Sequence, residues 1–250
     1  MSTHAETTYP PRSAARPRRW SPVRVLSAIA LASWAGLFWF LIVTDRTSFY
    51  LSSRTDWVVP VGAILLTFAT LGRLVFARVE DPEPLTRKET LGLALIIFPV
   101  VTVLALPTSS LGSYAASRRS SLTSGSFVSS AEDIASGELS LVDVSGATRS
   151  REAMRALVKR AGEQVSFTGF VTRDSTTPAN EFVLTRFLIS CCVADALSAD
   201  VRIVGAIPGK FKVDEWVRVE GAMYPLGREV IVDATDIVGV PRPKKPYLNP

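Results

Sequence analysis

Three long apolar segments in the first 106 residues most constrain how this chain can fold. Val25–Val43 has 19 residues and no charge. As a helix rising about 1.5 Å per residue it spans about 28 Å, close to the hydrocarbon thickness of a bilayer. Two further apolar segments follow, at Trp57–Ala77 and Leu91–Leu106, and short polar loops separate the three. The sequence therefore predicts a transmembrane domain over residues 23–110, with helices at about 24–43, 57–77 and 91–106.

The first segment has a competing interpretation, because arginines followed by an apolar core also begin a secretory signal peptide. Its apolar core is longer than that of a usual signal peptide, and no small-x-small cleavage site follows it. We therefore interpret Val25–Val43 as a retained helix.

The distribution of Lys and Arg predicts the orientation of these helices. Residues 1–24 contain five arginines and one acidic residue, and three basic residues lie between the second and third segments (Arg78, Arg87 and Lys88). In the first loop, two aspartates balance two arginines. Because cytoplasmic loops carry the excess of basic residues, we expect a multi-pass protein of the cell membrane with a cytoplasmic N-terminus. Three crossings then place the chain beyond Pro107 outside the cytoplasm.

The net charge of +5 does not indicate a nucleic-acid partner. Most of the excess lies in the N-terminal tail, whereas residues 107–250 hold 17 Lys and Arg against 16 Asp and Glu. A nearly neutral domain lacks the basic surface that binds a phosphate backbone. We expect the lipid bilayer, and no nucleic acid, among the partners.

Two segments have the composition of unstructured chain. Residues 1–22 are rich in Ser, Thr, Pro and Arg without apolar periodicity, which predicts a disordered basic tail. Residues 111–130 are rich in Ser and Gly, which predicts a linker.

The C-terminal half changes to a period of two from Gln164 onward, which is typical of strands. We expect five strands, near residues 164–171, 182–189, 201–207, 216–222 and 230–240. Glycines at mid-strand positions, Gly169 and Gly221, permit the sharp coiling of a small barrel. Two short helices precede the strands, one begun by Ser130 and ended by Gly137, the other at Arg151–Arg160 with Ser150 as N-cap. The sequence predicts a mostly β, extracytoplasmic, OB-like barrel over residues 131–250.

Both cysteines of the chain are adjacent, at Cys191 and Cys192, with Asp195 three residues beyond. Three interpretations remain open. The thiolates bind zinc or another thiophilic metal with Asp195 or a partner's groups, they form a strained vicinal disulfide, or they pack as small apolar side chains. Neighbouring side chains on a regular strand point to opposite faces, so a shared ion requires a bulge or a strand end. The single histidine, His4, lies in the tail, which excludes a Cys₂His₂ site.

Arg186 stands within the apolar strand that leads to these cysteines. A buried arginine needs a partner, and Asp195 is a candidate, whereas an arginine on an exposed edge strand needs none. The chain contains no G-x-S-x-G, no H-E-x-x-H and no Gly-rich phosphate loop. We therefore expect no enzymatic activity.

The block R-F-L-I-S-C-C-V-A-D, from Arg186 to Asp195, resembles the signature R-F-x-x-x-C-C-x-A-D of the YcgQ-like permease-subunit membrane proteins of bacteria. Further matching motifs are G-F-V at Gly169–Val171, W-V-R-V-E-G at Trp216–Gly221 and P-x-P-K-K-P-Y-L at Pro241–Leu248. The S-F-Y-L-S loop at 48–52 and L-G-S at 111–113 match the membrane half of that family.

This resemblance implies an accessory subunit of a two-component transport system that pairs with a polytopic permease, with a link to metal or metalloid handling. It assigns no catalytic residue. It marks Arg186 and Trp216 as signature or partner-contacting residues. Cys191, Cys192 and Asp195 also belong to its signature, and their role as candidate metal ligands is inferred from the residues themselves. A second hypothesis from the residues is an extracytoplasmic metal or redox sensor that uses the cysteine pair.

Overall fold

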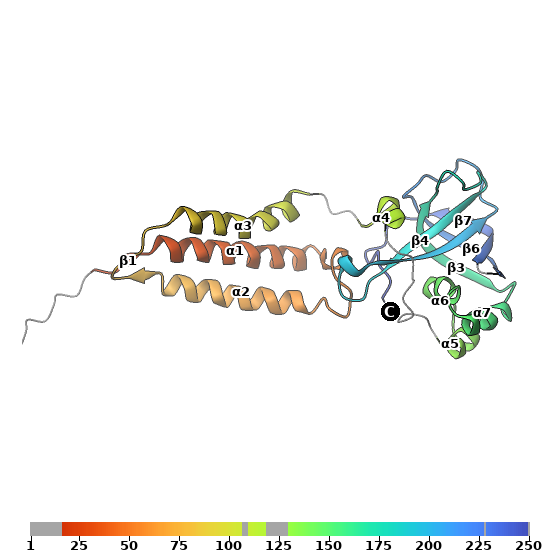
Figure 1. Cartoon of the computed structure of the whole chain (residues 1–250), viewed down its shortest axis with the longest axis horizontal. Helices are drawn as coiled ribbons and strands as arrows, with labels where there is room; N and C mark the ends of the chain where they lie inside the picture. The colour runs from red at the N-terminus through yellow and green to blue at the C-terminus, as the bar shows by residue number, and fades with distance from the viewer. Residues whose placement is uncertain (1–16, 107–109, 119–129, 228, 250) are drawn as a thin grey trace, which may run out of the picture. The chain divides into compact units, whose positions relative to one another are not determined.

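The computed structural model describes residues 17–106, 110–118, 130–227 and 229–249. The chain divides into two compact units (Figure 1). The first comprises residues 1–40 and 60–106. The second comprises Leu41–Val59 together with Pro107–Pro250, so the loop between the first two long helices belongs with the C-terminal domain.

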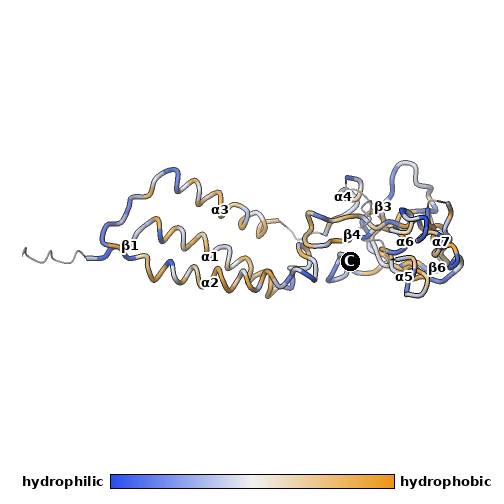
Figure 2. Tube along the Cα trace, turned by 60° about the horizontal axis from the view of Figure 1, so that its bottom comes forward, coloured by the Kyte–Doolittle hydropathy of each residue, from blue (hydrophilic) through white to orange (hydrophobic). Residues whose placement is uncertain are grey.

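The first unit consists of three long helices, each long and apolar enough to cross a membrane, which indicates a multi-pass membrane protein. Figure 2 shows the apolar residues along all three. Within the unit, α1 lies between the other two (Figure 1). The Trp34 indole donates to the Ile96 carbonyl at 3.0 Å, and the Trp39 indole donates to the Thr67 hydroxyl at 3.2 Å. The helices are α1 (Pro22–Val43), α2 (Val58–Val75) and α3 (Arg87–Ala105).

The third helix begins four residues before the apolar segment that predicts it. The Thr86 hydroxyl accepts from the Glu89 amide, and the Glu89 carboxylate accepts from the Thr86 amide at 2.9 Å. This capping box satisfies the first amides of α3, which is why the helix extends through polar residues at its start.

Two segments expected to be unstructured contain regular elements. Of the N-terminal tail, residues 1–16 lie outside the described residues, but β1 (Arg19–Trp20) pairs with β2 (Arg78–Val79), and the Arg78 guanidinium stacks 4.9 Å from the Trp20 ring. Of the linker, residues 119–129 lie outside the described residues, but Ser113–Arg118 forms the short helix α4. The Asp214 carboxylate caps α4 by accepting from the Ser113 amide at 2.6 Å.

The second unit contains a closed five-stranded barrel with the order β3-β4-β5-β7-β6, which confirms the OB-like prediction. Its strands run antiparallel except for the parallel pair β5–β7, and β3 closes the barrel against β6. The strands are β3 (Gln164–Thr172), β4 (Glu181–Leu188), β5 (Leu197–Val204), β6 (Trp216–Leu226) and β7 (Glu229–Gly239).

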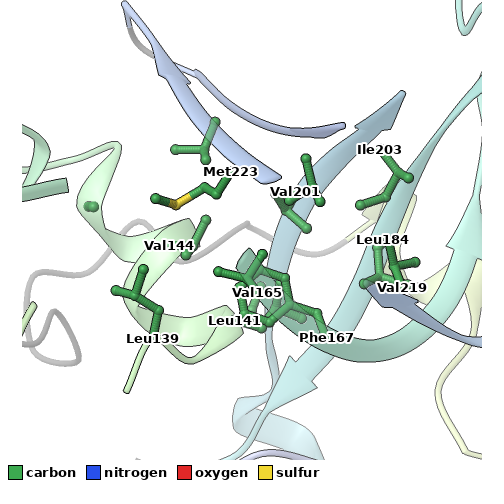
Figure 3. Packing of buried hydrophobic residues seen from close by; sticks show 14 of the residues in the cluster. Leu139, Leu141, Val144, Val165, Phe167, Leu184, Val201, Ile203, Val219 and Met223 are labelled. Atoms are coloured by element: carbon green, nitrogen blue, oxygen red, sulfur yellow. The ribbon is translucent and has the colours of Figure 1, made fainter. Parts of the chain in front are cut away.

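Three short helices precede the barrel and pack against it: α5 (Ala131–Ser136), α6 (Leu141–Ala147) and α7 (Arg151–Val158). Ser130 and Ser150 cap α5 and α7 as expected, and the sequence pattern missed α6. Figure 3 shows Leu141 and Val144 of α6 beside inward side chains of the barrel such as Val165 and Met223. These side chains belong to one buried apolar cluster, which makes helices and barrel a single folded domain.

Candidate functional site

The cysteine pair lies in a tight turn just beyond the end of β4. The strand ends at Leu188, and a 3₁₀ turn, η3 (Val193–Asp195), leads from the cysteines into β5. The Asp195 carboxylate closes this turn by accepting from the Ser190 amide at 3.2 Å and from the Cys191 amide at 2.8 Å. We call residues 190–195 the cysteine turn.

Both thiols are free, with Cys191 exposed and Cys192 half-buried. Their sulfur atoms lie 3.7 Å apart, too far for a disulfide bond of about 2.05 Å and close enough for van der Waals contact. Because the pair follows the strand, the alternation that sends neighbouring side chains to opposite faces no longer applies. The structure therefore brings the two sulfurs to the same side, as a strand end was expected to allow.

Electrostatics in the turn keep the first thiol protonated. The Asp195 carboxylate and the neighbouring Cys192 sulfur raise the pKa of Cys191 to about 11. Burial raises the pKa of Asp195, but hydrogen bonds from Cys191 and from the Ser190 and Cys192 amides outweigh this and lower it. The turn thus holds a carboxylate beside a neutral thiol, which is a poor nucleophile at neutral pH.

The loop between α1 and α2 binds directly to the main chain of the cysteine turn. The Cys191 carbonyl accepts from the Ser52 amide at 3.1 Å and from the Thr55 hydroxyl at 2.6 Å. At the next residue of the turn, Cys192 forms an antiparallel bridge with Leu51. The Val193 amide then donates to the Tyr50 carbonyl at 2.8 Å. The loop therefore meets the turn in a single β-bridge with main-chain hydrogen bonds on either side of it.

The C-terminal tail completes this arrangement. The Asn249 side-chain oxygen accepts from the Ser52 hydroxyl at 2.8 Å and from the Ser53 amide at 3.2 Å. The Ser48 hydroxyl donates to the Lys244 carbonyl at 2.8 Å. A cavity of about 20 Å³ lined by loop, tail and Ile189 is large enough for a water molecule and too small for an organic ligand.

Arg186 binds the C-terminal tail, whereas Asp195 was its candidate partner in the sequence. Its guanidinium donates to the carbonyls of Pro246 at 3.0 Å and Lys245 at 2.9 Å, and it lies 5.8 Å from the centre of the Trp216 ring. Burial lowers the pKa of Arg186. The two signature residues thus hold the tail against the barrel, where Trp216 also packs against Phe170.

The structure brings together two of the three candidate metal ligands. Across the described ranges of the chain, no three His, Cys, Asp or Glu side chains are grouped so as to hold a metal ion. Cys191 and Cys192 come together, whereas both oxygens of Asp195 already bind backbone amides. Any ion held here needs further ligands from outside this set.

Sequence reasoning missed a polar ladder on the outer face of the barrel. The Asp200 carboxylate accepts from the hydroxyls of Thr185 and Ser198, each at 2.8 Å, and Thr172 lies 3.0 Å from Thr185. Burial of Asp200 raises its pKa. A pocket of about 250 Å³ opens beside the ladder. These residues come from three strands, so only knowledge of the strand register would have grouped them.

Residues 141–250 match the family model described as the DUF1980 C-terminal domain. The match extends from α6 through the barrel to the tail and includes the cysteine turn, Arg186 and Trp216. No curated protein matches the chain.

Proposed function

We propose that this protein is a non-enzymatic accessory subunit of a membrane transport system, in which the three helices dock a polytopic permease. The observation that carries the proposal is the exposure of the apolar helices. Within the chain, 11% of the apolar window of α2 and 6% of that of α3 are buried. In a membrane, exposed apolar helix faces of this kind contact lipid or pack against the helices of a partner protein.

The organisation of the second unit supports an outward-facing domain. The loop Leu41–Val59 and the barrel belong to one compact unit, which supports placing both on the same side of a membrane. Three crossings are consistent with that placement. Together with the basic residues at the N-terminal end, they favour a cytoplasmic N-terminus and an extracytoplasmic barrel near the mouth of the permease.

The resemblance to the YcgQ-like permease subunits supports the choice of partner. The signature block from Arg186 to Asp195 lies within the region that matches the DUF1980 C-terminal domain. On this proposal, the system handles a metal or metalloid.

Photo-crosslinking from within α3 tests the proposal. A photoreactive amino acid at Phe98, which is 66% exposed, should crosslink in membranes to a protein with many apolar spans, identified by mass spectrometry. The same amino acid at Val100, 4% exposed, is the matched control and should give no such adduct. Adducts with lipid alone from Phe98, and likewise from Phe68 on α2, would overturn the proposal.

A second candidate function is an extracytoplasmic metal or redox sensor. The contact between the Cys191 carbonyl and Thr55 favours it, because α2 begins only three residues later at Val58. A change at the thiols would reach a membrane helix through the loop. Thiol labelling of intact cells, with and without reductant and added Zn²⁺, tests this function. Labelling that never occurs under any of these conditions rules the sensor out.

A further inference from the structure

We propose that Cys191 and Cys192 form a two-sulfur site for a thiophilic divalent cation such as Zn²⁺ or Cd²⁺, with ligands from outside the chain completing its coordination. The inference deepens the proposed function by naming the class of cargo. Binding of the ion by the two thiols does not depend on that function, whereas transfer of the ion to a permease rests on it.

The spacing of the sulfurs is the first observation. Two sulfur ligands at about 2.3 Å from one zinc ion, on adjacent corners of a tetrahedron, lie about 3.8 Å apart. The Cys191 and Cys192 sulfurs lie 3.7 Å apart. One ion can therefore bridge them without a change in the backbone, and the two thiol protons leave for solvent as it binds.

The turn holds this spacing through main-chain contacts on both sides. The Asp195 carboxylate accepts from the Cys191 amide at 2.8 Å, and the Ser52 amide donates to the Cys191 carbonyl at 3.1 Å. The Leu51–Cys192 bridge holds the next residue. A site whose ligands are ordered in advance loses less entropy when it binds an ion.

The exposure of the thiols indicates an open metal site, not a closed structural one. Cys191 is exposed and Cys192 is half-buried, so solvent or a partner reaches the positions that the sulfurs leave open. Closed structural zinc sites use four protein ligands, whereas sites that exchange a ligand keep positions open. Sulfur ligands select soft and borderline cations over Mg²⁺ and Ca²⁺. The arrangement suits an ion that is captured and then passed on.

Asp195 contributes as a positioning residue and as a negative charge. Both of its oxygens accept hydrogen bonds from the Ser190 and Cys191 amides, so its role is to hold the turn in place and not to bind the ion. Substitutions of groups that orient metal ligands cost about 10- to 100-fold in affinity. Loss of one of only two sulfur ligands must cost at least the upper end of that range.

Titration of the reduced, full-length protein in detergent with Cd²⁺ tests the site through the ultraviolet charge-transfer absorption of cadmium–thiolate bonds. The expected result is one Cd²⁺ per chain, displaced by Zn²⁺ and not by Mg²⁺. Cys191→Ser and Cys192→Ser should each weaken binding at least about 100-fold, and Asp195→Asn about 10-fold. Ser190→Ala, in the same turn, is the control and should bind as the wild type does.

Absence of the absorption band in the wild type, or single serine variants that bind like the wild type, would overturn the inference. Thermal melts of each variant show whether it is folded, and Ser replaces Cys with little change of volume. Crosslinking of Phe98 to a permease without Cd²⁺ binding overturns this inference and leaves the proposed function standing. Cd²⁺ binding without that crosslink supports the site and removes the permease as its partner.

Discussion

At the scale of single residues, burial of the Asp200 carboxyl makes the stability of the folded domain depend on pH. Its carboxyl lies on the outer face of β5, and burial raises its pKa above the ordinary value near 3.8. The folded state therefore binds this proton more tightly than the unfolded state, so stability falls as pH rises from about 4 through the folded pKa. We expect Asp200→Asn to remove this loss, so that the variant gains melting temperature relative to wild type as pH increases.

Melting curves of the full chain between pH 4 and 8, followed by tryptophan fluorescence, measure this effect. Asp174→Asn is the control, because hydrogen bonds from the side chain and amide of Thr176 lower the pKa of the exposed Asp174 to about 2. Its folded pKa lies below the tested range and its ordinary value of 3.8 lies at the lower edge, so above about pH 5 its offset from wild type should not change with pH. A constant offset for Asp200→Asn as well would contradict the prediction.

Gly221 occupies a position where a side chain does not fit. A β-carbon there would lie 2.2 Å from the Asp233 carbonyl oxygen, at the irregularity where β6 pairs with β7. We expect Gly221→Ala to destabilise the barrel by about 1–3 kcal/mol, measured by denaturant unfolding. Gly239→Ala is the control, because its β-carbon would meet only the flexible end of Glu215, at 3.3 Å. Equal effects of the two substitutions would contradict the steric argument.

At the scale of elements, the C-terminal tail depends on Arg186. Hydrogen bonds from a charged donor contribute about 1.5–3 kcal/mol, and Arg186 makes two of them to the tail carbonyls of Lys245 and Pro246. In the tail, the Lys244–Lys245 bond is open to trypsin, whereas prolines block cleavage after Arg242 and after Lys245. We expect Arg186→Gln to speed cleavage after Lys244 by about 10- to 100-fold.

The time course of that cleavage, followed by mass spectrometry of the full chain, gives the rate. Arg218→Gln is the control, because Arg218 pairs at the surface with Glu220 at 3.6 Å, and exposed pairs contribute little. If Arg186→Gln is cut no faster than Arg218→Gln, the tail is held by contacts other than those of Arg186, which contradicts the prediction.

At the scale of the whole molecule, the shared unit of loop and barrel has a topological consequence. On the proposed topology, residues 41–59 and the barrel lie on the same side of the membrane, and the loop between α2 and α3 lies on the other. In a background with both native cysteines replaced by serine, we expect Ser53→Cys to react with a membrane-impermeant maleimide in intact cells. Glu83→Cys should react only after the cells are permeabilised. The reverse pattern would invert the proposed orientation, and labelling of both in intact cells would exclude three crossings.

Much of the local structure was predictable because short-range chemistry determines it. Ser130 and Ser150 mark helix starts in the sequence, and the alternation from Gln164 marks the barrel strands. The α6 helix was missed although Ser140 and Asp143 form a capping box, because its seven residues show too little periodicity. The partners of Arg186 were not predictable, since they follow it by about sixty residues in an extended tail.

The sequence by itself determined the three apolar helices, the five strands and the position of the cysteine pair, because each depends on hydropathy or spacing within one segment. Only the tertiary structure decided that both thiols lie on one side of a turn, since that depends on where β4 ends. It also decided that the loop between α1 and α2 holds this turn. In that contact the Thr55 hydroxyl donates to the Cys191 carbonyl across 136 residues, and no local pattern encodes a hydrogen bond between groups so far apart.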